Sequence, residues 1–207
     1  MSARHYPLML DPSDLNQLIR ARRTHKRFGG AAVPRQDLQE LVAMLAWAPN
    51  HRLTQPWRVR VLEQDAVAAL GSWLLGHVEE VLAASSKPEK DRAKIEKLAA
   101  YYFSSIGAVL QITQVIDPDP ATALEDYGAV CAGVQNCLLL AEAKGLAAFW
   151  STSSLMANPV LLRQLGIDPG QERLVASLWL GSAVDTPPIP ARNSPASYTT
   201  WISKDAL

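Results

Sequence analysis

Three short stretches of the sequence collect side chains that can do chemistry. The first, RARRTHKRF, runs from Arg20 to Phe28, the second, APNHRLTQPWRV, from Ala48 to Val59, and the third, GLAAFWSTSS, from Gly145 to Ser154. Guanidinium, ammonium, hydroxyl, imidazole, amide and indole groups occur there within a few residues of one another. A plain connecting loop does not need such groups, so each stretch is a candidate part of a binding site.

In the first stretch, cationic side chains surround a threonine. Arg22, Arg23 and Lys26 lie within two residues of Thr24. Guanidinium groups donate paired hydrogen bonds and a hydroxyl adds a neutral donor, a combination that suits a phosphate. The alternative is structural, because basic residues at the end of a helix offset its macrodipole without any ligand. The presence of Thr24 favours the phosphate.

In the second stretch, two prolines bracket a set of polar side chains. Pro49 and Pro56 would stiffen a loop and Trp57 would open a buried strand, which is a purely structural interpretation. That interpretation leaves four polar residues without a role: Asn50, His51, Arg52 and Gln55.

The third stretch is a predicted strand that ends in Trp150 and four hydroxyl residues, Ser151 to Ser154. The hydroxyls would either cap the helix that follows or face a cleft. A strand end whose backbone N–H groups and hydroxyls face a cleft is a common place for a cofactor.

Several classes of protein are disfavoured by composition. Twenty Lys and Arg residues balance 20 Asp and Glu residues, so no overall charge favours a nucleic acid or an acidic membrane surface. No run of about 18 apolar residues occurs, and the first ten residues lack the apolar core of a secretion signal. We therefore expect a cytoplasmic protein without nucleic-acid or membrane partners.

Motif searches narrow the chemistry further. No GxGxxG or Walker sequence supports a dinucleotide fold or a P-loop, and no GxSxG supports a hydrolase. The four histidines are not spaced along the sequence, relative to one another or to the cysteines, as the ligands of a metal such as zinc would be. They are His5, His25, His51 and His77. Cys131 and Cys137 fall roughly 9 Å apart along one predicted helix, too far for a disulfide, and are expected to be reduced core residues.

Hydrophobic periodicity and capping signals predict helices interspersed with strands, an α+β or α/β domain. A length of 207 residues favours a single domain over residues 1–207. The proline-rich stretch 187–207 is expected to be an extended C-terminal arm. Helices are expected over 11–23, 34–47, 64–84, 87–102, 121–144 and 160–165, and strands over 57–62, 106–116, 145–152 and 173–182.

One predicted helix, 121–144, is apolar on nearly all sides between Tyr127 and Ala143. Such a helix must be covered all round, either by the core or by a partner subunit. The strand over 106–116 is a continuous apolar run, which predicts a central position in the sheet.

Taken together, four motifs in register resemble the flavin-dependent nitroreductase family. They are RRTHKRF, AWAPNHRLTQPWRV, KGLAAFWST after a long apolar helix, and a late strand ending LWLGS. The resemblance extends from about Leu15 to Ile202 and is closest to the short bacterial subgroup. It implies an α+β nitroreductase fold, with a mostly antiparallel central sheet flanked by helices. It also implies a homodimer that holds one FMN per subunit at the interface.

Residue by residue, the resemblance implies these roles. Arg22, Arg23 and Thr24 would bind the FMN phosphate and ribityl chain, and Lys26 would lie near the ring or the nicotinamide. Trp47 and His51 would line the flavin pocket of the partner chain. The segment along the flavin edge would be Trp150, Ser151 and Thr152, with a backbone N–H of Thr152 or Ser153 donating to flavin N5.

The resemblance also has departures. Leu53 stands where many members have Asn, Thr152 and Ser153 replace an acidic residue and a glycine, and only Arg192 and Lys204 are near the position of C-terminal basic residues of longer members. The expected activity is transfer of hydride from NAD(P)H through FMN to a nitroaromatic or quinone by a ping-pong mechanism, with no side chain assigned as essential acid or base. The alternative is a flavin-sequestering or flavin-modifying relative that does not turn over NAD(P)H.

Overall fold

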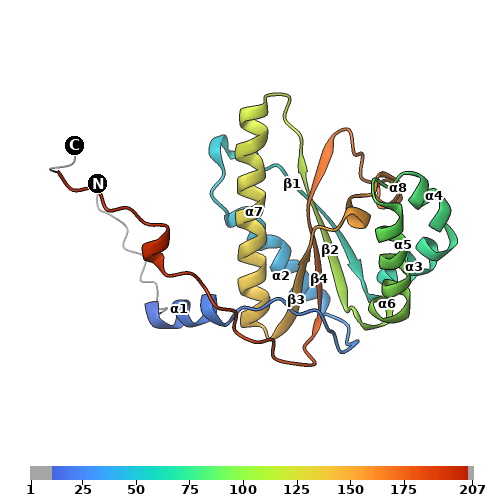
Figure 1. The fold of residues 1–207 in the computed structure, drawn as a ribbon, viewed down its shortest axis with the longest axis horizontal. Coiled ribbons are helices and arrows are strands. Elements are labelled where there is room, and N and C mark those ends of the chain that lie inside the picture. The colour runs from blue at the N-terminus through green and yellow to red at the C-terminus, as the bar shows by residue number, and fades with distance from the viewer. Residues whose placement is uncertain (1–10, 205–207) are drawn as a thin grey trace.

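The computed structural model describes residues 11–204, and the N-terminal stretch with His5 and the last residues of the expected arm lie outside this range. Four antiparallel strands form one sheet in the order β1-β2-β4-β3, flanked by helices on both faces (Figure 1). This is the α+β arrangement that the sequence predicted. The strands are β1 (Trp57–Glu63), β2 (Ala108–Val115), β3 (Leu146–Ser151) and β4 (Glu172–Ser182).

The two central strands are the most apolar. β2 is buried along nearly its whole length and pairs with both β1 and β4, which confirms its predicted central position. β3 forms one edge, and its pairing with β4 runs from Leu146 opposite Ser182 to Ser151 opposite Ser177. The third candidate stretch is therefore an edge strand and the segment that leaves it.

The helices follow the predicted order, with some breaks. The predicted helix 34–47 ends in a 3-10 turn, Met44–Trp47, and the predicted helix 64–84 divides at His77. The predicted helix 87–102 ends in a π-helical turn, Leu98–Tyr102. The bounds are α1 (Pro12–Ala21), α2 (Arg35–Ala43), α3 (Gln64–Gly76), α4 (Val78–Ala83), α5 (Pro88–Lys97), α6 (Phe103–Ser105), α7 (Pro120–Ala143) and α8 (Pro159–Gln164).

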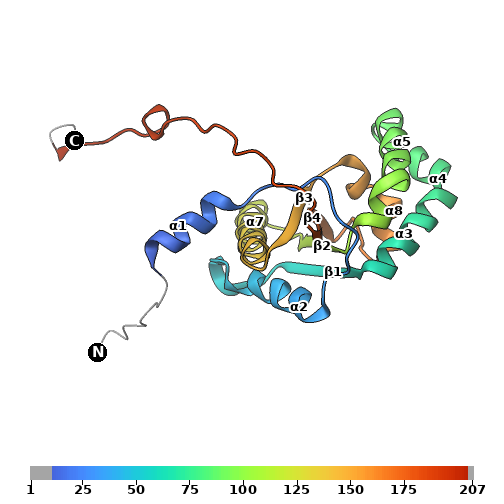
Figure 2. The same cartoon turned by 90° about the horizontal axis from the view of Figure 1, so that it is seen from below.

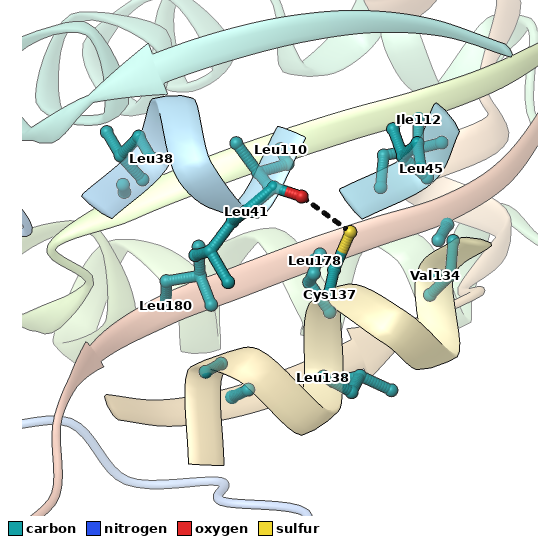
Figure 3. Packing of buried hydrophobic residues seen from close by; sticks show 14 of the residues in the cluster. Leu38, Leu41, Leu45, Leu110, Ile112, Val134, Cys137, Leu138, Leu178 and Leu180 are labelled. Atoms are coloured by element: carbon teal, nitrogen blue, oxygen red, sulfur yellow. Dashed lines mark hydrogen bonds between the residues drawn. The ribbon is translucent and has the colours of Figure 1, made fainter. Parts of the chain in front are cut away.

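A first hydrophobic cluster fills the space between the sheet, α2 and α7 (Figure 3). Leu41 and Leu45 pack against Val134 and Cys137 of α7, and the Cys137 thiol donates to the Leu41 carbonyl at 3.0 Å. A Cβ on Gly133 would lie 3.1 Å from the Leu45 Cα, so glycine allows this close approach. The long apolar helix is thus covered on one side by the core of its own chain.

Helices α3, α5 and α8 lie on the opposite face of the sheet (Figure 2). A second hydrophobic cluster fills the space between these helices and the sheet. Trp179 of β4 is the largest buried side chain that the sheet contributes to this cluster. Its ring meets Phe149 of β3 edge to face, with ring centroids 5.2 Å apart. Successive residues of β3 face opposite sides of the sheet, because Phe149 packs against the second cluster and Trp150 against the first.

Two segments extend away from this body on the same side, α1 and the C-terminal arm (Figures 1 and 2). α1 has no buried residue, and its apolar Leu15 and Ile19 are exposed. Apart from a 3-10 turn at Pro195–Ser197, the described part of the chain has no helix or strand between 187 and 203. The large side chains of the arm are also exposed, including Trp201 at 92%.

Both cysteines are free, as expected from their spacing. Cys137 is buried in the first cluster, whereas Cys131 is only half-buried, so the prediction of two core residues was right for one of them. Within the described range, no helix is long and apolar enough to cross a membrane.

Candidate functional site

The first candidate stretch crosses the end of the sheet as an extended segment. The His25 N–H donates to the Ala148 carbonyl of β3 at 2.9 Å, and Phe28 pairs with Ala183 just after β4. His25 and Phe28 are buried at 8% and 2% exposure, so their side chains point inward. Thr24 and Lys26, on either side of His25, are exposed. The segment thus presents a hydroxyl and an ammonium at the surface beside β3.

The two arginines before Thr24 have different surroundings. Arg22 is the C-cap of α1, and Arg23 folds its guanidinium back onto the helix end, donating to the carbonyls of Arg20 at 2.5 Å and of Arg22 at 2.7 Å. Arg23 therefore satisfies helix carbonyls, which is the structural role considered for the whole cluster. Arg22 is half-buried, and its side chain has no hydrogen-bond or ion-pair partner between residues 11 and 204.

The third candidate stretch leaves the sheet next to this segment, because both border β3. The Trp150 indole donates to the Val175 carbonyl at 3.1 Å, and Ser151 is buried at 2% exposure. Thr152 is exposed, and the Ser154 hydroxyl donates to Asp91 of α5 at 2.6 Å. The four successive hydroxyls thus face different surroundings, and only Ser154 anchors the chain to a helix.

Two buried polar atoms in this region have no partner. They are Nδ1 of His25 and Oγ of Ser153, the only such side-chain atoms found among the described residues. A buried polar atom without a hydrogen bond costs about 1–3 kcal/mol, so such atoms call for a partner that the chain does not supply. One belongs to the first candidate stretch and one to the third. The donors and acceptors present therefore fit a polar ligand held beside β3.

The second candidate stretch is bound to the start of α7. Asn50 and Thr54 both contact Oδ1 of the buried Asp126, and the backbone N–H of Gln55 donates to the Asn50 side chain at 2.7 Å. His51 lies 2.8 Å from Glu125. The structure therefore corrects one inference, because several polar residues of the loop have roles within their own chain. Arg52 also takes part, donating to Thr122 at 3.3 Å.

The loop nevertheless carries backbone strain. Arg52, Leu53 and Gln55 have φ values of 60°, 52° and 47°, in the left-handed region that L-residues rarely adopt. Such residues cluster at functional sites, because surrounding contacts must hold them in place. The contacts with Asp126 and Thr122 supply that support.

A single chain does not bring all the predicted site residues together. Arg22 to Lys26 and Trp150 to Thr152 adjoin β3, whereas the loop with His51 is bound to the start of α7, at the other end of that helix from the segment after α1 (Figure 1). Trp47, on the 3-10 turn after α2, is 77% exposed. Its large indole therefore faces outward, and so does the exposed His51.

Sequence reasoning missed two site neighbours on α5, Asp91 and Lys94. Asp91 holds the segment after β3, and the ammonium of Lys94 lies 5.4 Å from the ring centroid of Trp179. The spacing of lysines along α5 was visible in the sequence. Nothing in the sequence showed that this helix packs beside the end of β3.

Comparison with known proteins decides the family. The sequence model of the nitroreductase family matches residues 19–182, a range that includes all three candidate stretches. The chain belongs to the nitroreductase family. The crystal structure of a nitroreductase-like family protein from Bacillus cereus is similar to this nitroreductase-family chain at 29% identity and a TM-score of 0.77, covering 98% of each chain.

Two further relatives extend the comparison. YfhC of Bacillus subtilis, provisionally named an NAD(P)H nitroreductase, is 25% identical over 87% of this chain and 90% of its own length. The FMN-dependent nitroreductase NfnB from Mycobacterium smegmatis, solved in complex with NADPH, is 18% identical with a TM-score of 0.69, covering 93% of this chain and all of that one. The fold predicted from the resemblance is therefore confirmed.

Proposed function

We propose that the protein is an FMN-dependent oxidoreductase that uses NAD(P)H to reduce an electron-poor acceptor. The observation that carries the proposal is a pair of buried atoms, His25 Nδ1 and Ser153 Oγ, that have no partner among residues 11–204. The Arg22 guanidinium, in the same stretch as His25, also has no partner among these residues. These groups belong to the two segments that border β3. Their position in a nitroreductase-family chain supports a flavin between those segments.

The relatives support the same assignment. NfnB is described as FMN-dependent and was solved with NADPH, and a nitroreductase from Bacteroides fragilis was solved with bound FMN. When bound here, FMN would supply the acceptance of hydride from NAD(P)H and its delivery to a nitroaromatic or quinone. Because one pocket would serve both substrates in turn, we expect ping-pong kinetics.

In this proposal, the residues of this chain bind the cofactor and position it. Arg22 and Thr24, with Arg23 at the helix end, would hold the phosphate and ribityl chain, and Lys26 would lie near the ring or the nicotinamide. Trp150, Ser151 and Thr152 would line the ring edge, and a backbone N–H of Thr152 or Ser153 would donate to N5. No side chain is assigned the transfer of an essential proton.

Trp47 and His51 are proposed to complete the flavin site of a second copy of the chain. Their exposure and their separation from Arg22 within one chain support a role in trans. The proposal therefore includes a homodimer with both sites at the interface. It also includes a single cytoplasmic domain, in which residues 187–207 serve as an arm rather than a separate unit.

The test has two readouts. Acid release of the cofactor from the purified protein, followed by chromatography, is expected to yield FMN, and NAD(P)H oxidation is expected to continue with menadione or a nitrofuran as acceptor. A protein that binds FMN without turnover would be the flavin-sequestering or flavin-modifying alternative. A protein that stays colourless with excess FMN would refute the proposal.

A further inference from the structure

The helix α5 and the turn after it are attached to both segments of the candidate flavin site. Asp91, 2% exposed near the start of α5, accepts hydrogen bonds from Ser154 and from Ser85, each at 2.6 Å. At the other end, the Tyr101 hydroxyl donates to the Phe28 carbonyl at 3.3 Å. The stretch between Asp91 and Tyr101 therefore spans from the segment after β3 to the segment before Gly29.

A row of lysines lies on this stretch between the two attachments. Lys90, Lys94 and Lys97 are spaced by four and three residues, so they share one face of α5. The half-buried Lys94 ammonium lies 5.4 Å from the centroid of the buried Trp179 ring, a cation–π contact that orients the side chain. Its position is thus defined rather than free in solvent.

Lys94 forms no ion pair among the described residues. The Asp91 carboxylate favours its charged form but already accepts hydrogen bonds from two serine hydroxyls. Burial and the nearby charges of Lys97, Lys90 and Lys26 lower the pKa of the Lys94 ammonium. An anion bound here would relieve the repulsion, and Lys26 of the first candidate stretch belongs to the same group of charges.

We propose that Lys94, with Lys90 and Lys26, binds the phosphate groups of the nicotinamide dinucleotide that reduces the flavin. The inference rests on the proposed function and names the part of the substrate that this surface recognises. Ammonium groups bind phosphates as point charges, and the expected acceptors, nitroaromatics and quinones, carry no phosphate. The dinucleotide would extend from the nicotinamide near Lys26 across the lysine face of α5.

Kinetics with a truncated reductant test this assignment. We expect Lys94→Gln to lower kcat/KM for NADPH about tenfold or more, mainly through KM, and to leave kcat/KM for a phosphate-free reductant, 1-benzyl-1,4-dihydronicotinamide, within about twofold. Arg92→Gln is the matched control, because it removes one charge from a different face of α5, where Arg92 pairs with Glu79. Equal losses with both reductants, or none with either, would overturn the inference.

Direct binding gives a second readout. Calorimetric titration with NADP⁺ is expected to show weaker binding to Lys94→Gln by a similar factor, but unchanged binding to Arg92→Gln. If Lys94→Gln affects NADPH and NADH alike, Lys94 binds the pyrophosphate. If it affects NADPH alone, Lys94 binds the 2′-phosphate. Unchanged NADP⁺ affinity would overturn the proposal.

Two further comparisons show whether a negative result comes from a misfolded variant, from a wrong proposed function or from a wrong phosphate site. Lys94→Arg keeps the charge and is expected to retain most of the NADPH activity, and FMN content and melting temperature confirm that each variant is folded. If the wild-type protein oxidises neither NADPH nor the phosphate-free reductant, the proposed function itself fails. If it oxidises both and Lys94→Gln matches it, only the phosphate site fails.

Discussion

At the scale of single residues, neighbouring side chains of the same type have different roles because their partners differ. Arg23 is occupied by two helix carbonyls, whereas Arg22 beside it has no partner in the described part of the chain. His25 and Ser153 each bury a polar atom without a hydrogen bond. The free-energy cost of these atoms is offset if a ligand satisfies them, so these residues, rather than the charge of the stretch, indicate the site.

Replacing Arg22 tests this distinction. We expect Arg22→Ala to weaken FMN binding by about 1.5 to 3 kcal/mol, roughly ten- to hundredfold in the dissociation constant, because a charge-assisted contact to phosphate is lost. FMN fluorescence titration measures the change. Arg20→Ala removes an exposed arginine from the same helix end and is expected to bind FMN normally. Equal affinity of Arg22→Ala and the wild type would leave Arg22 as a helix cap only.

The buried thiol of Cys137 gives a prediction about pH. Burial raises its pKa to about 12 from an ordinary value of 9.0, so the thiol stays protonated in the folded protein at pH 8. We expect a thiol reagent at pH 8 to label Cys137 only after unfolding, as measured by peptide mass mapping. Rapid labelling of Cys137 in the native protein would contradict the packing seen in Figure 3.

The same shift contributes to stability over a defined pH range. A pKa raised on folding gives stability that is fully present below the unfolded value and is lost as the pH rises toward the folded one. The contribution of Cys137 is therefore expected to disappear between about pH 9 and pH 12. Urea unfolding across this range should show a smaller pH dependence for Cys137→Ala than for the wild type.

At the scale of elements, β3 organises the candidate site. The first candidate stretch is bound to it through Ala148, the third candidate stretch continues it, and α5 is fixed to its exit through Asp91. The loop from Ala48 to Pro56 is organised differently, by side chains that bind the first turns of α7. Its three residues with positive φ make this anchoring necessary.

Removing the anchor is expected to release the loop. In Asp126→Ala, the side chains of Asn50 and Thr54 lose their shared acceptor, so we expect faster hydrogen exchange over residues 50–56 and weaker FMN binding. Glu125→Ala is the control, because it removes only the exposed contact with His51, a surface pair worth about 0–1 kcal/mol. Unchanged exchange in Asp126→Ala would show that other contacts hold the loop.

At the scale of the whole molecule, one chain leaves large apolar side chains uncovered. Trp47, Leu53 and Leu124 are exposed near the loop, and Tyr198, Trp201 and Ile202 are exposed on the arm. α1 has no buried residue at all. Exposed apolar surface of this extent marks an interaction site. The proposed homodimer would cover it and place the loop of one chain near the flavin segments of the other.

Two measurements test the dimer and its shared sites. An interface that includes α7, α1 and the arm is expected to exceed about 2,000 Å², in the obligate range, so sedimentation at low micromolar concentration should show only dimer. Mixing Arg22→Ala chains with His51→Ala chains, with exchange of subunits, should restore one intact flavin site in each heterodimer. A stable monomer loaded with FMN would refute the shared site.

Local patterns in the sequence determined the elements and most of the fold. The strands and α7 were predicted to within a few residues. The signals were proline and aspartate caps, the period-two or helical spacing of apolar residues, and the glycine at 145, and all of them act between near neighbours. The motifs also pointed to the family, which the family match then confirmed. The breaks at His77 and at the π-helical turn were missed, since packing against other elements sets them.

The tertiary structure alone decided how the candidate residues are grouped. Only the folded chain shows that Asn50 is committed to Thr54 and Asp126. Only the folded chain shows that the Arg23 side chain binds helix carbonyls, while the Arg22 side chain has no partner among the described residues. Only the folded chain brings Lys94 of α5 over Trp179 of β4. These contacts join residues far apart in sequence, and their partners depend on how helices pack on the sheet. Local sequence patterns carry no record of that packing.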